Sequence, residues 1–520
     1  MTDTASAPGN TTRSWRETFM SLRHPRVVTM LMFGFSAGLP LLLIFSSLSA
    51  WLTEAGVARA AVTFFSWAAL GFSFKFVWAP LVDQVPLPWL TRRLGRRRGW
   101  LLVAQLLVVV AICWMALTDP TAHGGQLVMM ACAAVMLGFS AATQDIVIDA
   151  YRIECAEKNM QALLAASYMT GYRIGMIFAG AGSLLLATYF GSTAEQYSYE
   201  AWRLTYLCMA GCMAVGIATT LSIDEPAINR AGVDKTYSTS EYSRIVLLFG
   251  ISATVFISSF YFSGSIAVHA KQSLGGLLPT SGHVIGFFVE AARLLTAIIC
   301  ALIGALTLTA ARLVKRSMLE DFYINPIRDF FSRYPVRLAL LILLLIGTYR
   351  ISDIVLGVIA NVFYLELGFS KPTIGTTGQV FGMVITIAGT FVGGMLTTRY
   401  GVIRILFLGA LLSAATNILF IILAQAGPNL LLLRGVIAAD NLAGGIAAAS
   451  FIAFLSSLTS ISFTASQYAI FSSLMTLFPK LLGGYSGTIS TAVGYPGFFL
   501  FTALLGVPVL VLIVLVRKVE

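Results

Sequence analysis

The sequence predicts an all-α integral membrane protein with fourteen membrane-spanning helices. First, 58% of the 520 residues are hydrophobic and only 11% are charged, whereas ordinary soluble proteins are about 25% charged. Second, apolar segments of roughly 18 residues or more, each able to cross a hydrocarbon layer about 30 Å thick, recur along almost the whole chain. Third, the alternating ten-residue strands of a membrane barrel are absent, so we expect these segments to be helices.

The predicted spans are apolar stretches separated by polar breaks. In chain order they cover residues 27–52, 61–81, 100–118, 126–150, 160–190, 201–223, 244–264, 283–311, 337–360, 373–396, 403–424, 431–455, 464–490 and 495–516. Pro40 lies inside the first span, where the missing backbone donor of proline predicts a kink. GxxxG spacings such as Gly34/Gly38 and Gly171/Gly175 are a weak signal of close helix approach, since chance alone yields several among 46 glycines.

The net charge of +11 comes from Lys and Arg residues that lie mainly in short loops. If the N-terminus is cytoplasmic, the inside loops contain about 22 of them, whereas the outside loops contain Arg59, Lys271 and Lys371. This bias predicts that both termini are cytoplasmic, and it argues against a nucleic-acid-binding surface. Residues 1–26 are polar and basic, and no small-residue cleavage site follows them, so we expect the first span to remain in the membrane.

The sequence gives little support to an enzyme. The four histidines, His24, His123, His269 and His283, are scattered and form no HExxH motif. The six cysteines show no CxxC or Cys/His spacing, so we expect neither a metal site nor a disulfide framework. No Walker A loop is present, so we expect no cofactor and no use of ATP by this chain. Uphill movement of a solute would then depend on an ion gradient, and buried carboxylates suit protons.

An internal repeat indicates the architecture. The motif "APLVDQ" followed by "GRRRG" has a weaker echo in "GGMLTTRYGVIR", residues 393–404. The pair resembles the loop signature of the major facilitator superfamily, in which a glycine, an acidic residue and a basic cluster join spans two and three, and again spans eight and nine. The resemblance implies an inner gate, for which the candidate residues are Asp83, Arg96, Arg97, Arg98, Arg152, Arg399 and Arg404.

In a twelve-helix facilitator six spans separate the two loops, whereas eight predicted spans separate them here. We therefore expect a major facilitator fold with two six-helix bundles and two additional helices inserted between them. The expected domains are a cytoplasmic tail (1–26), a first bundle (27–223), a central insert with a cytoplasmic linker (224–336), a second bundle (337–516) and a short tail (517–520). The linker at 316–335 either lies flat on the membrane surface or is disordered, since Pro326 interrupts any single helix.

The stretch "TQDIVIDAYR" places three charges at the end of the fourth span. Asp145, Asp149 and Arg152 have i, i+4 and i+7 spacing and form one stripe of a helix. Two carboxylates one turn apart repel each other, so we expect one of them to take up a coupling proton. Arg173 lies at a similar predicted depth in the fifth span and is a candidate partner of Asp145. Lys75, near the inner end of span two, is expected to snorkel to the surface.

The second half has its own embedded polar residues, namely Arg350, Asp353, Asp440, Asn441 and Lys480. Embedded ionisable groups mark substrate sites or relays, but charge pairs between helices also act as structural locks, and both interpretations stay open.

Four motifs, "FKFVWAPLVDQ", "GRRRGWLL", "TQDIVIDAYR" and "GYRIGM", resemble the anhydromuropeptide permeases, the AmpG family of the same superfamily. The resemblance implies a proton-driven permease of the bacterial inner membrane that imports N-acetylglucosaminyl-1,6-anhydro-N-acetylmuramyl peptides for cell-wall recycling, a process linked to β-lactamase induction. It also implies that Asp83, Asp145 and Asp149 match acidic positions regarded as important in that family, and that Arg173 lies in the matching span-five motif.

Such a sugar-peptide carries carboxylates, which a guanidinium binds in a bidentate fork, so Arg173 and Arg350 are candidate ligands for them. Tyr172 and Tyr349, beside these arginines, are candidates for stacking on sugar rings, although they could equally be packing residues.

Two alternatives to this function stay open. One is a transporter of the same fold for another glycoconjugate or an acyl-carrier solute. The other is a non-transporting membrane protein that assists the assembly of other complexes. The expected partners are the anhydromuropeptide, protons and membrane lipid, with no nucleic acid, and we expect the protein to be a monomer.

Overall fold

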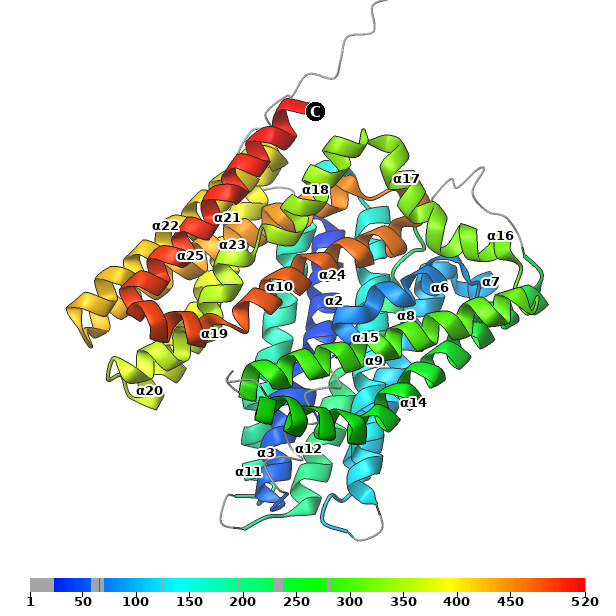
Figure 1. Ribbon diagram of the computed structural model, residues 1–520, viewed down its shortest axis with the longest axis horizontal. Helices are drawn as coiled ribbons and strands as arrows, with labels where there is room; N and C mark the ends of the chain where they lie inside the picture. Colours follow the sequence, from blue (N-terminus) through cyan, green and yellow to red (C-terminus); the bar gives the residue numbers. More distant parts are fainter. Residues whose placement is uncertain are drawn as a thin grey trace, which may run out of the picture. The chain divides into compact units, whose positions relative to one another are not determined.

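The structure is a computed structural model that describes residues 23–57, 65, 70–122, 125–193, 196–227, 237–277 and 282–519. All regular elements in these ranges are helices (Figure 1). Twelve of the described helices are long and apolar enough to cross a membrane. The predicted span 61–81 lies partly outside the described residues, and the predicted span 464–490 corresponds mainly to a helix that is not among the twelve. The all-α membrane fold is therefore confirmed, whereas the count of fourteen spans stays a prediction.

Contacts divide the chain into two compact units, residues 1–229 with 330–520 and residues 230–329. The first part of the larger unit consists of α2 (Pro25–Leu42), η1 (Leu43–Ser47), α3 (Leu48–Glu54), α5 (Leu70–Phe74), η3 (Lys75–Val77), α6 (Ala79–Gln84), α7 (Leu90–Leu94), α8 (Arg96–Ala116), α9 (Gln126–Glu154), η4 (Lys158–Met160), α10 (Gln161–Ile177), η5 (Phe178–Gly182), α11 (Ser183–Tyr189), α12 (Tyr199–Cys212) and α13 (Ala214–Ser222). We call these helices the first bundle. Pro40 lies inside α2, and the turn that follows, η1, is π-helical.

The remainder of the larger unit is the second bundle. It consists of α18 (Val336–Thr348), α19 (Ile351–Glu366), α20 (Lys371–Thr373), η7 (Ile374–Phe381), α21 (Gly382–Tyr400), α22 (Val402–Ala426), α23 (Leu430–Leu458), η8 (Ile461–Phe463), α24 (Thr464–Gly483) and α25 (Ser486–Val519). The predicted break between the last two spans corresponds to Gly494, whose φ of 70° interrupts α25, a conformation that glycine adopts at little cost.

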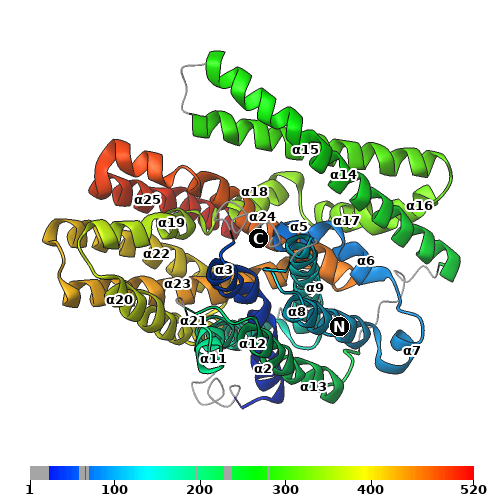
Figure 2. The ribbon, with the colours of Figure 1, turned by 90° about the horizontal axis from the view of Figure 1, so that it is seen from below.

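The smaller unit contains two long helices that lie side by side, α14 (Thr239–Leu277) and α15 (Gly282–Ala310) (Figure 2). Glu290 of α15 pairs with Lys271 of α14 at 2.8 Å and with Arg293 of its own helix at 3.1 Å. The segment that follows is helical: α16 (Arg316–Leu319), η6 (Glu320–Ile324) and α17 (Asn325–Arg333). The prediction of a disordered linker is therefore wrong, because residues 316–333 form one continuous helical segment. Pro326 follows closely on the π-helical turn η6, and such a turn is a place where a helix accommodates a proline.

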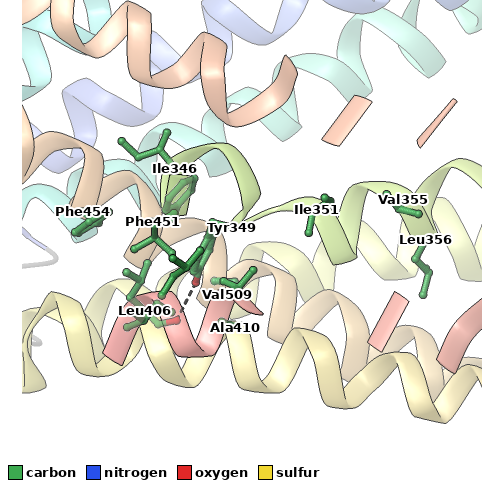
Figure 3. Close-up of a cluster of buried hydrophobic side chains, with 14 of the residues drawn as sticks. Ile346, Tyr349, Ile351, Val355, Leu356, Leu406, Ala410, Phe451, Phe454 and Val509 are labelled. Atoms are coloured by element: carbon green, nitrogen blue, oxygen red, sulfur yellow. Dashed lines mark hydrogen bonds between the residues drawn. The ribbon is translucent and has the colours of Figure 1, made fainter. Parts of the chain in front are cut away.

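The core of the second bundle lies around the break between α18 and α19. Figure 3 shows Tyr349 among apolar side chains from several helices, with its hydroxyl donating to the carbonyl of Leu406 at 3.0 Å. The ring of Tyr349 stacks on Phe451 with 4.2 Å between centroids. This packing holds the residue next to it, Arg350, at the point where the span is interrupted.

The first bundle depends on a close contact between α2 and α10. Gly34 and Gly38 of α2 face the backbone of Tyr168 and Tyr172, and Gly171 and Gly175 of α10 face the backbone of α2. A Cβ atom at any of these four glycines would collide with the backbone of the opposite helix. The two GxxxG spacings are therefore real packing motifs, and they form the two sides of one interface.

We expect Gly171→Ala to destabilise the protein by about 1–3 kcal/mol, because the new methyl group would collide with the Leu31 carbonyl and force α2 and α10 apart. Thermal unfolding in lipid nanodiscs measures the loss. The matched control is Gly211→Ala in α12, where no atom lies within 4 Å of the new Cβ, so the unfolding temperature should stay level or rise slightly. Equal unfolding temperatures for the two variants would contradict the proposed contact.

Candidate functional site

The predicted stripe on α9 lies beside two basic residues. A carboxylate oxygen of Asp149 lies 3.6 Å from Nζ of Lys75, and the other accepts a hydrogen bond from Nη2 of Arg152 at 3.3 Å. Asp145 accepts a hydrogen bond from the hydroxyl of Tyr168 at 3.0 Å. The side chain of Asp149 remains 13% exposed, and Asp145 is partly buried. The two acids are therefore held away from bulk water without being sealed, as a proton-exchanging group requires.

Irregular backbone brings Lys75 to this stripe. The helical path from α5 to α6 is interrupted by the 3-10 turn η3, which begins at Lys75. Just beyond that turn the indole of Trp78 donates to the Thr143 hydroxyl at 3.1 Å and fixes the segment against α9. Interrupted helices are a common way in which transporters place polar groups inside a membrane bundle.

Two expectations about partners are wrong. Lys75 does not snorkel to the surface, because its side chain is only 10% exposed and faces Asp149. Arg173 does not pair with Asp145, whose hydroxyl partner is Tyr168. Arg173 lies five residues beyond Tyr168, which displaces it about 7.5 Å along α10 and turns it to another side of the helix.

A second charged cluster lies at one end of the first bundle, the end at which the loop after α6 lies. Arg97 contacts Asp83 at 2.8 Å and Glu154 at 2.5 Å, and these three side chains are at most 2% exposed. We call Asp83, Arg97 and Glu154 the Asp83 cluster. The bidentate contact between Arg97 and Glu154 joins α8 to the end of α9. Burial raises the pKa of the adjacent Cys155 thiol to about 11, so this cysteine is a poor nucleophile.

The start of α8 is fixed by a residue that sequence reasoning missed. Glu225, just beyond α13, accepts hydrogen bonds from the backbone amides of Arg97 and Arg98 at 2.8 and 3.0 Å. An acidic group at a helix N-terminus satisfies free amides and stabilises the helix dipole. The side chains of the flanking arginines bind backbone carbonyls, Arg96 that of Asp83 and Arg98 those of Thr220 and Leu221.

The Asp83 cluster also connects the two bundles. Both the backbone amide and the hydroxyl of Ser466, at the start of α24, donate to Asp83 at 3.1 and 3.0 Å. Arg152 donates to the hydroxyl of Ser456 in α23 at 2.9 Å, and its guanidinium lies over the ring of Tyr468. Two of the gate residues predicted in the first bundle, Asp83 and Arg152, therefore contact the second bundle directly, and the role of the set as a gate stays a prediction.

The turn between α23 and α24, the two helices that provide these contacts, is supported by Arg333 at the end of α17. Its guanidinium donates to the carbonyl of Leu458 at 2.9 Å and to the side chain of Gln467 at 3.0 Å. The same oxygen of Gln467 accepts the backbone amide of Ser460 at 2.7 Å. Arg333 thus fixes both sides of the turn between α23 and α24.

We expect Arg333→Gln to loosen this turn, because it removes two charge-assisted hydrogen bonds of the kind worth about 1.5–3 kcal/mol each. Hydrogen exchange should be at least about tenfold faster at the amides of Ser460 and Ser466, since 1.4 kcal/mol corresponds to a factor of ten. Arg328→Gln is the control, since that arginine is exposed on the same helix. Unchanged protection in Arg333→Gln would show that the turn is held by other contacts.

The polar residues of the second bundle separate into two groups, the acids and Arg350 on the one hand and Asn441 on the other. Arg350 lies between α18 and α19 and pairs with Asp353 in the first turn of α19. Asp440 of α23 accepts a hydrogen bond from Thr416 at 3.2 Å. Asn441, by contrast, bonds its own helix at Ile437 and accepts from Thr386 of α21 at 2.7 Å, so its amide ties two helices together. A small cavity lies beside Arg350 and Asp353, lined also by Tyr349, Ser352, Ser413 and Ala447.

Other candidates lie outside this arrangement. Lys480 near the end of α24 is exposed, as is Arg404, and Arg399 lies over the ring of its neighbour Tyr400. Tyr349 is only 6% exposed with its ring stacked on Phe451, which leaves no open ring face for a sugar in this structure. Tyr172 is partly buried near Tyr168. Within the described residues no group of three or more potential ligands could hold a metal ion.

These features define a multi-pass membrane transporter, with charged side chains placed inside and between two helical bundles. Residues 27–364 match the Major Facilitator Superfamily, and the chain belongs to that family. It is therefore a transporter and not an enzyme.

The relatives agree with this assignment. The chain is 28% identical over 497 residues to the anhydromuropeptide permease of Escherichia coli, covering 95% of this chain and 80% of that protein. It is 27% identical over 493 residues to a Rickettsia felis protein named transporter AmpG 4, covering 95% and 97%. The resemblance seen in the sequence motifs is thus confirmed.

Solved structures show the same fold. The proton:xylose symporter XylE bound to 6-bromo-6-deoxy-D-glucose is similar with a TM-score of 0.57 at 13% identity, covering 95% of both chains. The Escherichia coli fucose:proton symporter FucP is similar with a TM-score of 0.55 at 12% identity, covering 97% of this chain and 99% of that one. The predicted major facilitator fold is confirmed.

Proposed function

We propose that this protein is a proton-coupled permease that imports anhydromuropeptides across the bacterial inner membrane for reuse of the cell wall. The observation that most directly supports it is the pair Asp145 and Asp149, partly buried inside a facilitator bundle beside Lys75 and Arg152. The names of the relatives support the choice of substrate. In this proposal both termini are cytoplasmic, no cofactor is needed, and the imported peptides contribute to β-lactamase induction.

The contacts suggest how coupling would work. Asp149 lies between two cations, which stabilise its charged form, whereas the neighbour that binds Asp145 is the neutral hydroxyl of Tyr168. Asp145 is therefore the better candidate for the group that takes up and releases the proton, and Asp149 for the group that holds Lys75 and Arg152 in place. Arg152 reaches Ser456 of the second bundle, so a change of charge on the stripe would alter a contact between the bundles.

The Asp83 cluster would act as the inner gate in the same scheme. Asp83 binds the start of α24 in the second bundle, and this contact must break for the bundles to separate at that end. A rocking motion of the two bundles would then expose the stripe alternately to each side of the membrane.

Uptake into vesicles tests the proposal. Proteoliposomes containing the purified protein should accumulate labelled anhydromuropeptide when an inward proton gradient is imposed, and a protonophore should abolish the accumulation. Accumulation of unrelated glycoconjugates in place of the muropeptide would favour a facilitator with another solute. If folded protein accumulates nothing, a role in the assembly of other complexes would become the better hypothesis.

A further inference from the structure

Asp440 of α23 points into the interior of the second bundle. Its neighbours on the same side of the helix, up to two turns away, are buried apolar residues, namely Leu433, Val436, Ile437, Ala443 and Ala447. The exposed residues of this part of α23 lie on other sides of the helix and are Leu431, Arg434, Gly435 and Leu442. The carboxyl group is therefore directed among apolar side chains, where a charge without compensation is costly.

Asp440 makes no ion pair with any described residue. The ionisable groups that interact electrostatically with it are Asp353 and Tyr364, both on α19, and neither is a cation. The basic residues of α23 itself and of the elements packed against it are Lys158, Arg173, Arg399, Arg404, Arg434 and Lys480. Since none of these pairs with Asp440, a negative charge on this acid would stay uncompensated inside the bundle.

The one described hydrogen bond of Asp440 fits its neutral form. Oγ1 of Thr416 lies 3.1 Å from the carbonyl oxygen of Ser413 and 3.2 Å from Oδ1 of Asp440. A hydroxyl has a single hydrogen, so beside an ionised Asp440 one of these two acceptors lacks a full hydrogen bond. A protonated Asp440 removes the conflict, because it donates to Thr416 while Thr416 donates to Ser413.

These contacts lead to the ion pair of Arg350 and Asp353 at the break between α18 and α19. Ser413 lines the small cavity beside that pair. Asn417, in the same turn of α22, donates at 2.8 Å to Ser352, the residue before Asp353. The protonation state of the acid on α23 therefore bears on how α22 meets the start of α19.

We propose that Asp440 is a positioning residue that holds a resident proton, donates it in a hydrogen bond to Thr416, and limits transport at alkaline pH by losing it. When the proton leaves to water, the hydroxyl of Thr416 turns from Ser413 to the carboxylate, and the carbonyl of Ser413 loses its donor. At neutral pH the proton stays bound throughout the cycle, so coupling remains with Asp145. The inference deepens the proposed function, on which its transport assay rests.

Exchange of labelled for unlabelled anhydromuropeptide, at equal pH on both sides of the vesicle membrane, tests this limit. The background is Asp145→Asn, in which the acid of the stripe no longer titrates. Above the pH at which Asp440 ionises, exchange should fall about tenfold per pH unit, as the protonated fraction does. Asp145→Asn with Asp440→Asn should keep its exchange over the same range, because the amide donates to Thr416 without titrating.

The matched control is Glu366→Gln in the same background. Glu366 also accepts a hydrogen bond from a hydroxyl, that of Tyr495 at 2.7 Å, but it is exposed at the end of α19. This control should decline as Asp145→Asn alone does. The inference is overturned if the variant with Asp440→Asn declines equally, or if none of the three declines. Asp440→Ser, which also offers a neutral donor, replaces the asparagine variant if that variant does not fold.

Thermal unfolding of the full chain in nanodiscs tests the resident proton without any substrate. The unfolded chain releases this proton near pH 4, as an ordinary aspartic acid does, at about 3.9. The folded protein keeps it at neutral pH, and a folded state that binds more protons than the unfolded chain loses stability as the pH rises. The unfolding temperature of the wild type should therefore fall relative to that of Asp440→Asn as the pH rises from acid to neutral.

The two proposals fail in different ways. A difference between wild type and Asp440→Asn that does not change with pH, together with normal gradient-driven uptake, would overturn the resident proton and leave the transport function intact. If the folded protein transports no muropeptide, the proposed function fails, and the unfolding temperatures still decide whether Asp440 holds a proton.

Discussion

Asp145→Asn should abolish proton-driven accumulation of anhydromuropeptide, reducing it to the level of protein-free vesicles. The amide can still accept the hydrogen bond from Tyr168 at the same place, but it cannot take up and release a proton. Exchange of labelled for unlabelled substrate across the membrane, which needs no net proton movement, should continue close to the wild-type rate. Initial rates of uptake and of exchange, measured in one vesicle preparation, check both expectations.

The control for this variant is Glu200→Gln, which removes a carboxylate that is 64% exposed at the start of α12. Its uptake should match that of the wild type. Full accumulation in Asp145→Asn would exclude Asp145 from coupling. Loss of both uptake and exchange would instead indicate that Asp145 is needed to bind substrate or to maintain the fold.

The largest effect on stability is expected from Arg97→Gln. It removes the guanidinium that pairs with two carboxylates, Asp83 and Glu154, whose side chains are 0% and 1% exposed. Breaking a buried ion pair from one side costs about 3–5 kcal/mol, because the remaining group stays buried after losing its opposite charge. Thermal unfolding in nanodiscs should therefore begin at a much lower temperature.

Arg98→Gln is the matched control, since the side chain of this neighbouring arginine donates to the backbone carbonyls of Thr220 and Leu221. We expect this variant to lose no more than about 1.5–3 kcal/mol, the worth of one hydrogen bond to a charged group, because the other of the two bonds is exposed to water. A loss in Arg97→Gln no greater than that in Arg98→Gln would mean that the Asp83 cluster adds little to stability.

Much of the fold could be predicted from the sequence because a membrane imposes a simple rule on composition. Apolar stretches longer than the bilayer is thick must be helices, so the long spans were identified from hydropathy alone. The rule was less successful near Lys75, where the helix is interrupted by a 3-10 turn, and at α24, which ends at Gly483 before the predicted span does. Polar residues in these two segments weaken the apolar pattern. The contacts that stabilise the two segments are made with residues far away in the sequence.

The candidate site was predictable where it depends on one helix. The spacing of Asp149 and Arg152 is sufficient to place them on one face of α9, and the structure confirms their contact. The partners across helices were not predictable, because they depend on helix register and on which faces meet. Three contacts between helices were missed for this reason. They are the contact of Tyr168, and not Arg173, with Asp145, that of Glu225 with the start of α8, and that of Ser466 with Asp83.

The most direct test of proton coupling uses no imposed gradient. The wild-type protein is placed in vesicles in the orientation that it has in the cell, with the same pH on both sides. When anhydromuropeptide is added outside, the weakly buffered external medium should become more alkaline, because protons enter with the substrate. Asp145→Asn vesicles preloaded with unlabelled substrate should take up the label by exchange without this change of pH. Uptake by the wild type with no accompanying movement of protons would contradict the account.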